Sequence, residues 1–173
     1  MDERMEGQLA PLPAGTVAPD FSLLHTPQAH LTLHHLCERP VVLVFYPLDW
    51  EPVSREQLAL CQDYAGEFDR FGAHLLGISI DHCLSHAAFA RDAQVRFPLL
   101  ADFHPRGAVA RAYGIYREEQ GVSARALFVL DGQGIIRFSQ AYPDLLNPGV
   151  DDLLTTLEAI TRDDEHPGAG WGA

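Results

Sequence analysis

An unbroken run of apolar residues from Val41 to Tyr46 is the clearest pattern in this chain. Its length and its β-branched and aromatic side chains predict a strand that is buried on both faces. Pro47 ends the run. Pro52 then fits the first turn of a helix, because the N–H that proline lacks would have no partner there and because its φ is already helical.

The residues after Pro52 predict a helix that continues to about Arg70 and is closed by Gly72. Its apolar positions recur at helical spacing: Leu58, Cys61, Ala65 and Phe68. Ser54 precedes Leu58 by one helical turn, so its side chain should point inward, where it meets free backbone N–H groups and the positive end of the helix dipole. A thiolate would gain much from this position. A serine hydroxyl, which is a far weaker acid, gains little.

A second apolar run, at residues 73–80, predicts another buried strand. Strand, helix and strand form a βαβ unit, so the two strands should be parallel with a right-handed crossover. Asp81 or Ser85 can cap a following helix that reaches about Gln94. We interpret residues 97–102 as an extended connector and residues 105–113 as a short helix.

The remaining segments complete one domain. A glycine turn at Gly132-Gln-Gly134 predicts an antiparallel hairpin of residues 126–131 and 135–139. Asn147-Pro148 is expected to begin the last helix. Short strands are predicted near residues 21–24 and within 26–39. The order βαβ, helices, ββα predicts an α/β fold with three α/β/α layers, in which helices flank a central mixed sheet.

The two ends of the chain are expected to lie outside this domain. Residues 1–19 are polar and rich in proline and glycine, and a flexible N-terminus is predicted over residues 1–11. Residues 163–173 predict a disordered C-terminal tail. The folded domain is therefore expected to span residues 12–162.

The amino-acid composition and net charge of the chain exclude several classes of function. The chain has 173 residues, of which 47% are apolar, enough for one well-packed domain. A net charge of −12 argues against nucleic acid or an anionic membrane as partner. No signal peptide or membrane-spanning run is recognised, which predicts a cytoplasmic protein. Three cysteines in that compartment, Cys37, Cys61 and Cys83, indicate thiols or redox chemistry rather than a disulfide scaffold.

Four segments of the chain, in order, resemble motifs of the peroxiredoxins, the alkyl hydroperoxide reductase and thiol-specific antioxidant family. Pro47-x-x-x-Glu51-x-x-Ser54 resembles the active-site motif Pro-x-x-x-Thr/Ser-x-x-Cys. Residues 122–131 resemble the strand that carries the family's arginine, here Arg125. Residues 18–23 and 97–102 match two further family segments. The resemblance covers residues 12–162 and is nearest the one-cysteine and bacterioferritin-comigratory branches.

This resemblance implies a thioredoxin-like fold and an enzyme of antioxidant defence. The implied reaction is reduction of hydrogen peroxide and organic hydroperoxides, with electrons from a thiol donor such as a thioredoxin-like protein. Neither a metal nor another cofactor is implied, since the reactive group is a cysteine. The resemblance also implies a homodimer, with a contact near Trp50.

The resemblance assigns roles to four residues. Ser54 stands at the position of the peroxidatic cysteine, and Arg125 would stabilise a thiolate there and orient the peroxide. Pro47 would shield the pocket from water. Glu51 occupies the place of the family's hydroxyl residue, and an ionised carboxylate accepts hydrogen bonds but donates none. Its charge also opposes formation of a thiolate.

Serine at position 54 predicts no thiol peroxidase activity through this position, because no base partner is evident that would ionise it. Either serine has replaced a cysteine by design or the chain is a naturally inactive member, and the otherwise intact pocket favours replacement. Cys83 follows the neighbouring parallel strand and is the better candidate for a resolving cysteine. Cys61 is a weaker candidate, since its place on the apolar stripe predicts a buried core residue. Cys37 is expected to be structural.

Two other function classes compete with this interpretation. A thioredoxin-like disulfide oxidoreductase would need a Cys-x-x-Cys motif, which is absent around Ser54. A redox-inactive member could act as a binding or holdase module. His82 and His86 lie one helical turn apart, but without a carboxylate at matching spacing they are more typical of a cap and a surface residue than of a metal site.

Overall fold

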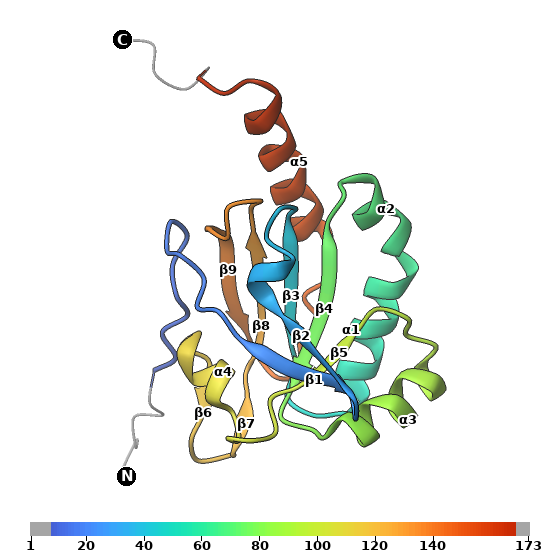
Figure 1. Cartoon of the computed structure of the whole chain (residues 1–173). Coiled ribbons are helices and arrows are strands. Elements are labelled where there is room, and N and C mark those ends of the chain that lie inside the picture. Colours follow the sequence, from blue (N-terminus) through green and yellow to red (C-terminus); the bar gives the residue numbers. More distant parts are fainter. Residues whose placement is uncertain (1–7, 169–173) are drawn as a thin grey trace.

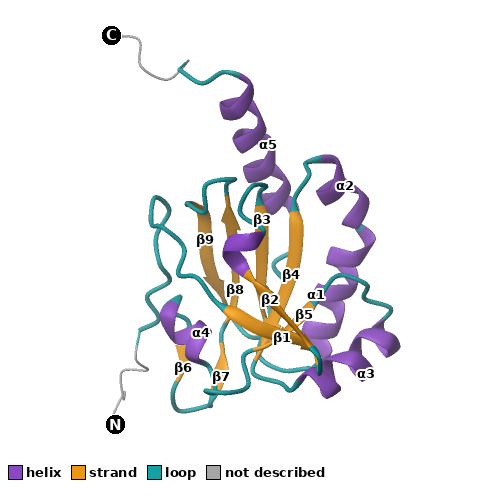
Figure 2. Cartoon of the chain, viewed as in Figure 1, coloured by secondary structure: helices purple, strands orange, loops and turns teal. Residues whose placement is uncertain are grey.

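A seven-stranded mixed sheet forms the centre of the structure, a computed structural model that describes residues 8–168 (Figures 1 and 2). The strand order is β2-β1-β5-β4-β3-β8-β9. The strands of the sheet are β1 (Ser22–Thr26), β2 (Ala29–Thr32), β3 (Val41–Phe45), β4 (His74–Ser79), β5 (Leu99–Ala101), β8 (Arg125–Leu130) and β9 (Ile136–Tyr142). Strands β3, β4 and β5 are parallel, whereas β8 and β9 run antiparallel to their neighbours. A separate hairpin joins β6 (Tyr116–Arg117) to β7 (Val122–Ser123).

Helices cover both faces of the sheet. They are η1 (Leu33–His35), α1 (Pro52–Asp63), α2 (Ala65–Arg70), α3 (Cys83–Ala93), α4 (Ala108–Ala112) and α5 (Asp151–Glu165). Helices α1, α2, α3 and α5 contribute to one apolar core, and η1 and α4 contribute to the other. Figure 1 shows α4 on the opposite side of the sheet from α1 and α5. The predicted three-layer α/β/α fold with a mixed sheet is therefore confirmed.

Strand β3 is buried on both faces, as its apolar run predicts. Val41, Leu43 and Phe45 face one core, while Val42 and Val44 face the other, and all five are 0% exposed. Strand β4 pairs with it in parallel along the whole of β3, so the predicted βαβ unit is confirmed. This unit places the start of α1 at the end of β3, beside β8.

The helix predicted at residues 52–70 is divided, because the backbone of Tyr64 leaves the helical conformation between α1 and α2. Gly66, a poor helix former, lies two residues after Tyr64 in the first turn of α2. Residues 97–102, predicted as a connector, contain strand β5, which extends the parallel sheet. The last helix begins at Asp151 rather than at Asn147, since the Asn147 side chain instead accepts a hydrogen bond from the Gly149 N–H in a turn.

The ends of the domain also differ from the prediction. Residues 1–7 and 169–173 lie outside the described part of the chain. Residues 8–11, expected to be flexible, are held in place: the Ala10 N–H donates to the Gly114 carbonyl at 3.1 Å. A Cβ on Gly114 would lie 1.9 Å from the Ala10 oxygen, so this contact requires glycine. Helix α5 continues to Glu165, past the predicted start of the tail. None of the helices in residues 8–168 is both long and apolar enough to cross a membrane.

Candidate active site

The start of helix α1 is capped by the side chain of Glu51. One carboxylate oxygen accepts from the Val53 N–H at 2.9 Å, and the other accepts from the Ser54 N–H at 2.7 Å. These are two of the N–H groups that a helix leaves without an internal partner. The sequence predicts that the side chain at position 54 meets these N–H groups. In the structure Glu51 binds two of them instead.

Ser54 is completely buried and lies between an anion and a cation. Its hydroxyl donates to Glu51 Oε2 at 2.7 Å and accepts from Arg125 Nη1 at 3.1 Å. Arg125 is the first residue of β8, which pairs with β3, so the sheet brings it to the start of α1. The structure therefore places Ser54, Glu51 and Arg125 in direct contact. Pro47 is buried just beyond the end of β3, before the loop that carries Glu51.

Two further groups complete the surroundings of Arg125, and the sequence analysis missed both. Gln57 Oε1 accepts from Arg125 Nη1 at 2.8 Å. The Asp144 carbonyl accepts from Nε at 3.1 Å and from Nη2 at 2.8 Å. Gln57 lies three residues after Ser54, so its inward position could have been read from the helical spacing. A backbone carbonyl in the loop after β9 leaves no signal in the sequence.

All five N–H groups of Arg125 are used, although the side chain is 0% exposed. Nη2 donates to Glu51 Oε2 at 2.9 Å, which makes an ion pair with a buried cation. Burial alone would raise the pKa of Glu51. Hydrogen bonds from the Ser54 hydroxyl, the Val53 N–H and Arg125 outweigh burial and lower that pKa to about 2. At neutral pH the site thus holds one cation and one anion.

The lowered pKa of Glu51 predicts a contribution to stability that depends on pH. Its pKa is about 2 in the folded protein against an ordinary 4.5, so the contribution is present above pH 4.5 and is lost as the pH falls towards 2. After discounting for screening at its solvent-facing edge, we expect Glu51→Gln to lower the free energy of unfolding by about 1–2 kcal/mol at pH 7. Urea titrations at pH 7 and pH 2.5 test this. A difference that persists undiminished at pH 2.5 would contradict it.

The loop before Glu51 is fixed by a buried network around Asp49. The Asp49 carboxylate accepts from the Tyr46 hydroxyl and the Ser85 hydroxyl, each at 2.8 Å, and lies 2.9 Å from His86 Nδ1. The other ring nitrogen, Nε2, lies 3.0 Å from the Leu100 carbonyl. Both ring nitrogens of His86 therefore lie against oxygen atoms of the protein. The loop is therefore held to α3 by a buried contact between the Asp49 carboxylate and the His86 ring.

This network replaces the predicted capping of α3. Asp81 accepts from the Asp49 N–H at 2.8 Å, and Ser85 donates to Asp49, so neither caps the helix. His82 caps it instead, by accepting from the Leu84 N–H through Nδ1. His82 and His86 therefore have separate structural partners. No group of three or more potential metal ligands occurs among residues 8–168.

None of the three cysteines is a hydrogen-bond partner of the Ser54 hydroxyl within residues 8–168. Cys61 faces the core beneath α1, and burial raises its pKa to about 12. Cys83, the first residue of α3, is 1% exposed, with its sulfur 3.6 Å from His82 Nδ1. Cys37 is half-buried near η1, and burial also raises its pKa.

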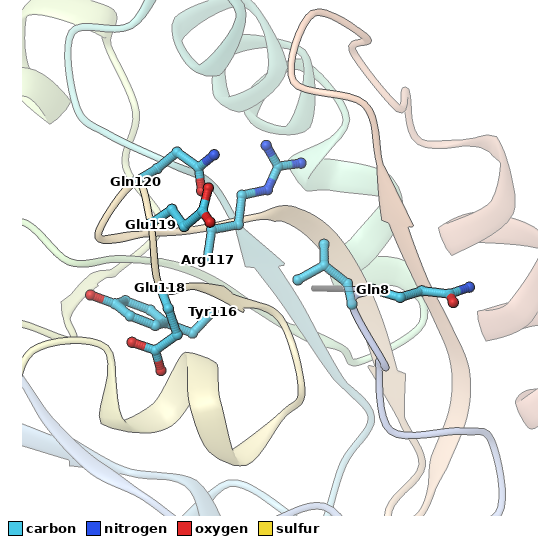
Figure 3. Close-up of a pocket in the computed structure, with 7 residues that line it drawn as sticks. Gln8, Tyr116, Arg117, Glu118, Glu119 and Gln120 are labelled. Atoms are coloured by element: carbon cyan, nitrogen blue, oxygen red, sulfur yellow. The ribbon is translucent and has the colours of Figure 1, made fainter. Parts of the chain in front are cut away.

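A surface cavity of about 570 Å³ lies at the β6–β7 hairpin (Figure 3). It is lined by Gln8, Leu9 and residues 116–120. Arg117, on its wall, donates to the Asp144 carboxylate at 2.6 Å. The backbone carbonyl of Asp144 in turn binds Arg125. One residue therefore links the wall of this cavity to the buried guanidinium.

Comparisons with known proteins agree with this geometry. Residues 14–139 match the family described as AhpC/TSA. Alkyl hydroperoxide reductase E of Mycobacterium tuberculosis is 38% identical over 130 residues, which are 75% of this chain and 85% of the relative. Bovine peroxiredoxin-2 is 33% identical over 141 residues, which are 76% of this chain and 70% of the relative. The reduced 2-Cys peroxiredoxin of Plasmodium vivax has the same fold, with a TM-score of 0.81 at 23% identity, covering 93% of this chain and 90% of that one.

The family match covers more than half of the chain, and it includes the loop of Glu51, the start of α1 and strand β8. The fold agrees with it. This chain belongs to the AhpC/TSA family, the peroxiredoxins, whose members are thiol-dependent peroxidases.

Proposed function

We propose that this chain has a peroxiredoxin pocket in which serine stands in place of the nucleophile, and that it does not reduce peroxide through position 54. In a thiol peroxidase, the thiolate sulfur attacks one peroxide oxygen and the O–O bond breaks. The sulfur becomes a sulfenic acid, and the other oxygen leaves as water or alcohol after taking up a proton. A serine hydroxyl cannot be oxidised in this way.

The observation that carries the proposal is the environment of the Ser54 hydroxyl. Glu51 is the carboxylate that accepts its hydrogen bond, and with a pKa of about 2 it is far too weak a base to remove the proton of an alcohol. Arg125, the other partner, is a permanent cation with no proton-accepting capacity. The site therefore has the electrostatic elements of peroxide reduction and lacks an ionised nucleophile.

Hydroperoxide consumption by the unaltered chain tests the proposal. With dithiothreitol as donor, we expect the native protein to consume hydrogen peroxide and cumene hydroperoxide no faster than the Ser54→Ala variant, which lacks only the hydroxyl. Background oxidation of the three native cysteines is the same in both proteins. A native rate well above that of Ser54→Ala would overturn the proposal.

The substrates and electron donors of the pocket follow from the family. Peroxiredoxins act on peroxides and are reduced by thioredoxin-like partners. We propose hydrogen peroxide and organic hydroperoxides as the substrates that the pocket would accept with a cysteine at position 54. Cys83 and Cys61 are both buried, so an external thiol is the proposed resolving group rather than either of them.

We also propose a homodimer through the rim around Trp50. Four apolar side chains there are unusually exposed: Leu48 (38%), Trp50 (53%), Leu84 (63%) and Phe103 (51%). Three of them lie at α3: Trp50 packs on Phe89 of this helix, Phe103 packs on His82 at its N-terminal end, and Leu84 belongs to its first turn. An apolar rim of this kind on a small acidic protein fits a second copy of the same surface.

A charge placed in this rim is expected to separate the dimer. Leu84→Glu adds a carboxylate to an exposed helix position, so the folded monomer should be little affected while a self-complementary contact is lost. Sedimentation velocity should show the native chain as a dimer and Leu84→Glu as a monomer. Leu145→Glu, at an 86% exposed position on the loop after β9, is the matched control and should remain dimeric. A native monomer would contradict the proposal.

A further inference from the structure

The buried cation of this site already has its counter-charge. We infer that Glu51 supplies the negative charge that a thiolate at position 54 carries in the peroxiredoxin motif. Glu51 and Ser54 are then a matched pair, and a cysteine restored at position 54 alone would stay protonated at neutral pH. This inference rests on the proposed function only in treating position 54 as the peroxidatic position.

The charge count comes directly from the contacts. Arg125 is 0% exposed and donates all five of its N–H groups within the protein. The acceptors are one hydroxyl, one amide, one backbone carbonyl and a single carboxylate, that of Glu51. A buried guanidinium needs one anion for electrical balance. With Glu51 ionised, this requirement is met before any group at position 54 ionises.

A thiolate at position 54 would be a second anion in contact with the first. The Ser54 oxygen lies 2.7 Å from Glu51 Oε2 and donates a proton to it. A thiol can also donate, but a thiolate cannot, so ionisation would replace a hydrogen bond by contact between like charges. At an effective dielectric constant of about 20 and about 4 Å between the centres of the two charges, this repulsion alone raises the thiol pKa by roughly three units.

Glu51 also takes the backbone donors that would favour a thiolate. It accepts from the Val53 N–H and the Ser54 N–H at the start of α1. A threonine at position 51 could still cap the helix with its single hydroxyl oxygen, and its O–H could donate to a sulfur anion. The residue at position 51 thus decides which anion the helix N–H groups and Arg125 stabilise. With glutamate at position 51 it is the Glu51 carboxylate, and with threonine it would be a thiolate at position 54.

This pairing bears on the origin of Ser54. A cysteine replaced by design would leave the rest of the site suited to a thiolate. Position 51 is not suited to one, because its carboxylate already holds the cation and two of the helix N–H groups. We therefore assign Ser54 as the residue that belongs to this site, in contrast to the expectation from the sequence.

The test measures the pKa of the thiol introduced at position 54 in Ser54→Cys and in the same variant with Glu51→Thr or Glu51→Gln. Iodoacetamide alkylation is followed from pH 5 to 10 by mass spectrometry of the peptide that contains residue 54, so the native cysteines do not contribute. We expect the thiol pKa in Ser54→Cys to be above the ordinary value of about 8.5. Either change at Glu51 should lower it by roughly two to three units.

Glu56→Gln is the matched control. Glu56 lies on the exposed face of α1, two residues from Ser54, so this change removes the same charge from the same helix without touching the site. Combined with Ser54→Cys, it should leave the alkylation profile unchanged. A thiol pKa below 7 in Ser54→Cys alone, or equal shifts from Glu56→Gln and Glu51→Gln, would overturn the inference.

The outcome is separable from that of the proposed function. Alkylation involves no peroxide, so its failure would leave the inactivity of the native chain untouched. Peroxide turnover by the native chain would contradict the proposed function without changing the charge assignment. Glu51→Gln is nearly isosteric with the native residue and keeps an oxygen to cap α1, so the test stands even if Glu51→Thr does not fold.

Discussion

Peroxide consumption is expected to be about 100-fold faster in the Glu51→Thr/Ser54→Cys variant than in Ser54→Cys alone at pH 7. The thiolate is the attacking species, and its fraction rises about tenfold for each unit by which the thiol pKa falls towards neutrality. Removing the Glu51 carboxylate leaves Arg125 without a counter-charge, so ionisation of the new thiol at position 54 becomes favourable. The threonine hydroxyl adds a donor beside the reacting sulfur.

The measurement is loss of hydrogen peroxide under single-turnover conditions, with the sulfenic acid at residue 54 trapped by dimedone. Adding Arg125→Met to the double variant should abolish the gain, since the cation that stabilises the thiolate is then absent. Ser54→Cys/Glu56→Gln should react as slowly as Ser54→Cys. If Ser54→Cys alone reached the rate of the double variant, residue 51 would have no part in setting the reactivity of this site.

Loss of the buried imidazole is expected to have the largest effect on stability. In His86→Leu, the Asp49 carboxylate would remain buried without its ring partner, and the Leu100 carbonyl would lose its contact with the ring nitrogen. Breaking one partner of a buried ion pair typically costs about 3–5 kcal/mol. Guanidinium titrations at pH 7 should show a loss of this size in the free energy of unfolding.

Two control variants test whether the loss of stability in His86→Leu comes from the contact between Asp49 and His86. Asp92→Asn breaks the exposed ion pair between Asp92 and Arg55, which should cost no more than about 1 kcal/mol. His86→Leu combined with Asp49→Asn removes the buried carboxylate together with its ring partner, so it should recover part of the loss. Equal destabilisation by His86→Leu and Asp92→Asn would show that the Asp49–His86 pair is not the anchor of the active-site loop.

The same anchor connects stability to the site. Asp49 is two residues before Glu51, and the intervening Trp50 adopts a left-handed backbone with a φ of 69°. Such a conformation is uncommon for a residue with a bulky side chain and persists only where surrounding contacts hold it. The Asp49–His86 pair and the packing of Trp50 on Phe89 supply these contacts. The position of the Glu51 carboxylate therefore depends on residues far from it in sequence.

Local pattern by itself determined the centre of the molecule. The apolar run of β3, the proline that opens α1 and the second run at β4 specified a parallel βαβ unit, and the glycine turn specified the β8–β9 hairpin. These features depend on residues close together in the chain, so periodicity and turn residues are enough to predict them. The motif order also placed Ser54 and Arg125 in one site.

Only the tertiary structure decided which polar groups pair with the charged side chains of that site. Gln57 and the Asp144 carbonyl bind Arg125, Glu51 caps α1, and His86 holds the loop through Asp49. Each contact joins groups whose identity is visible in the sequence but whose orientation is not. Burial removes water as an alternative partner, so every buried charge takes whichever polar group packing brings near it. The packed fold, rather than the motif, therefore decides which anion forms the ion pair with Arg125.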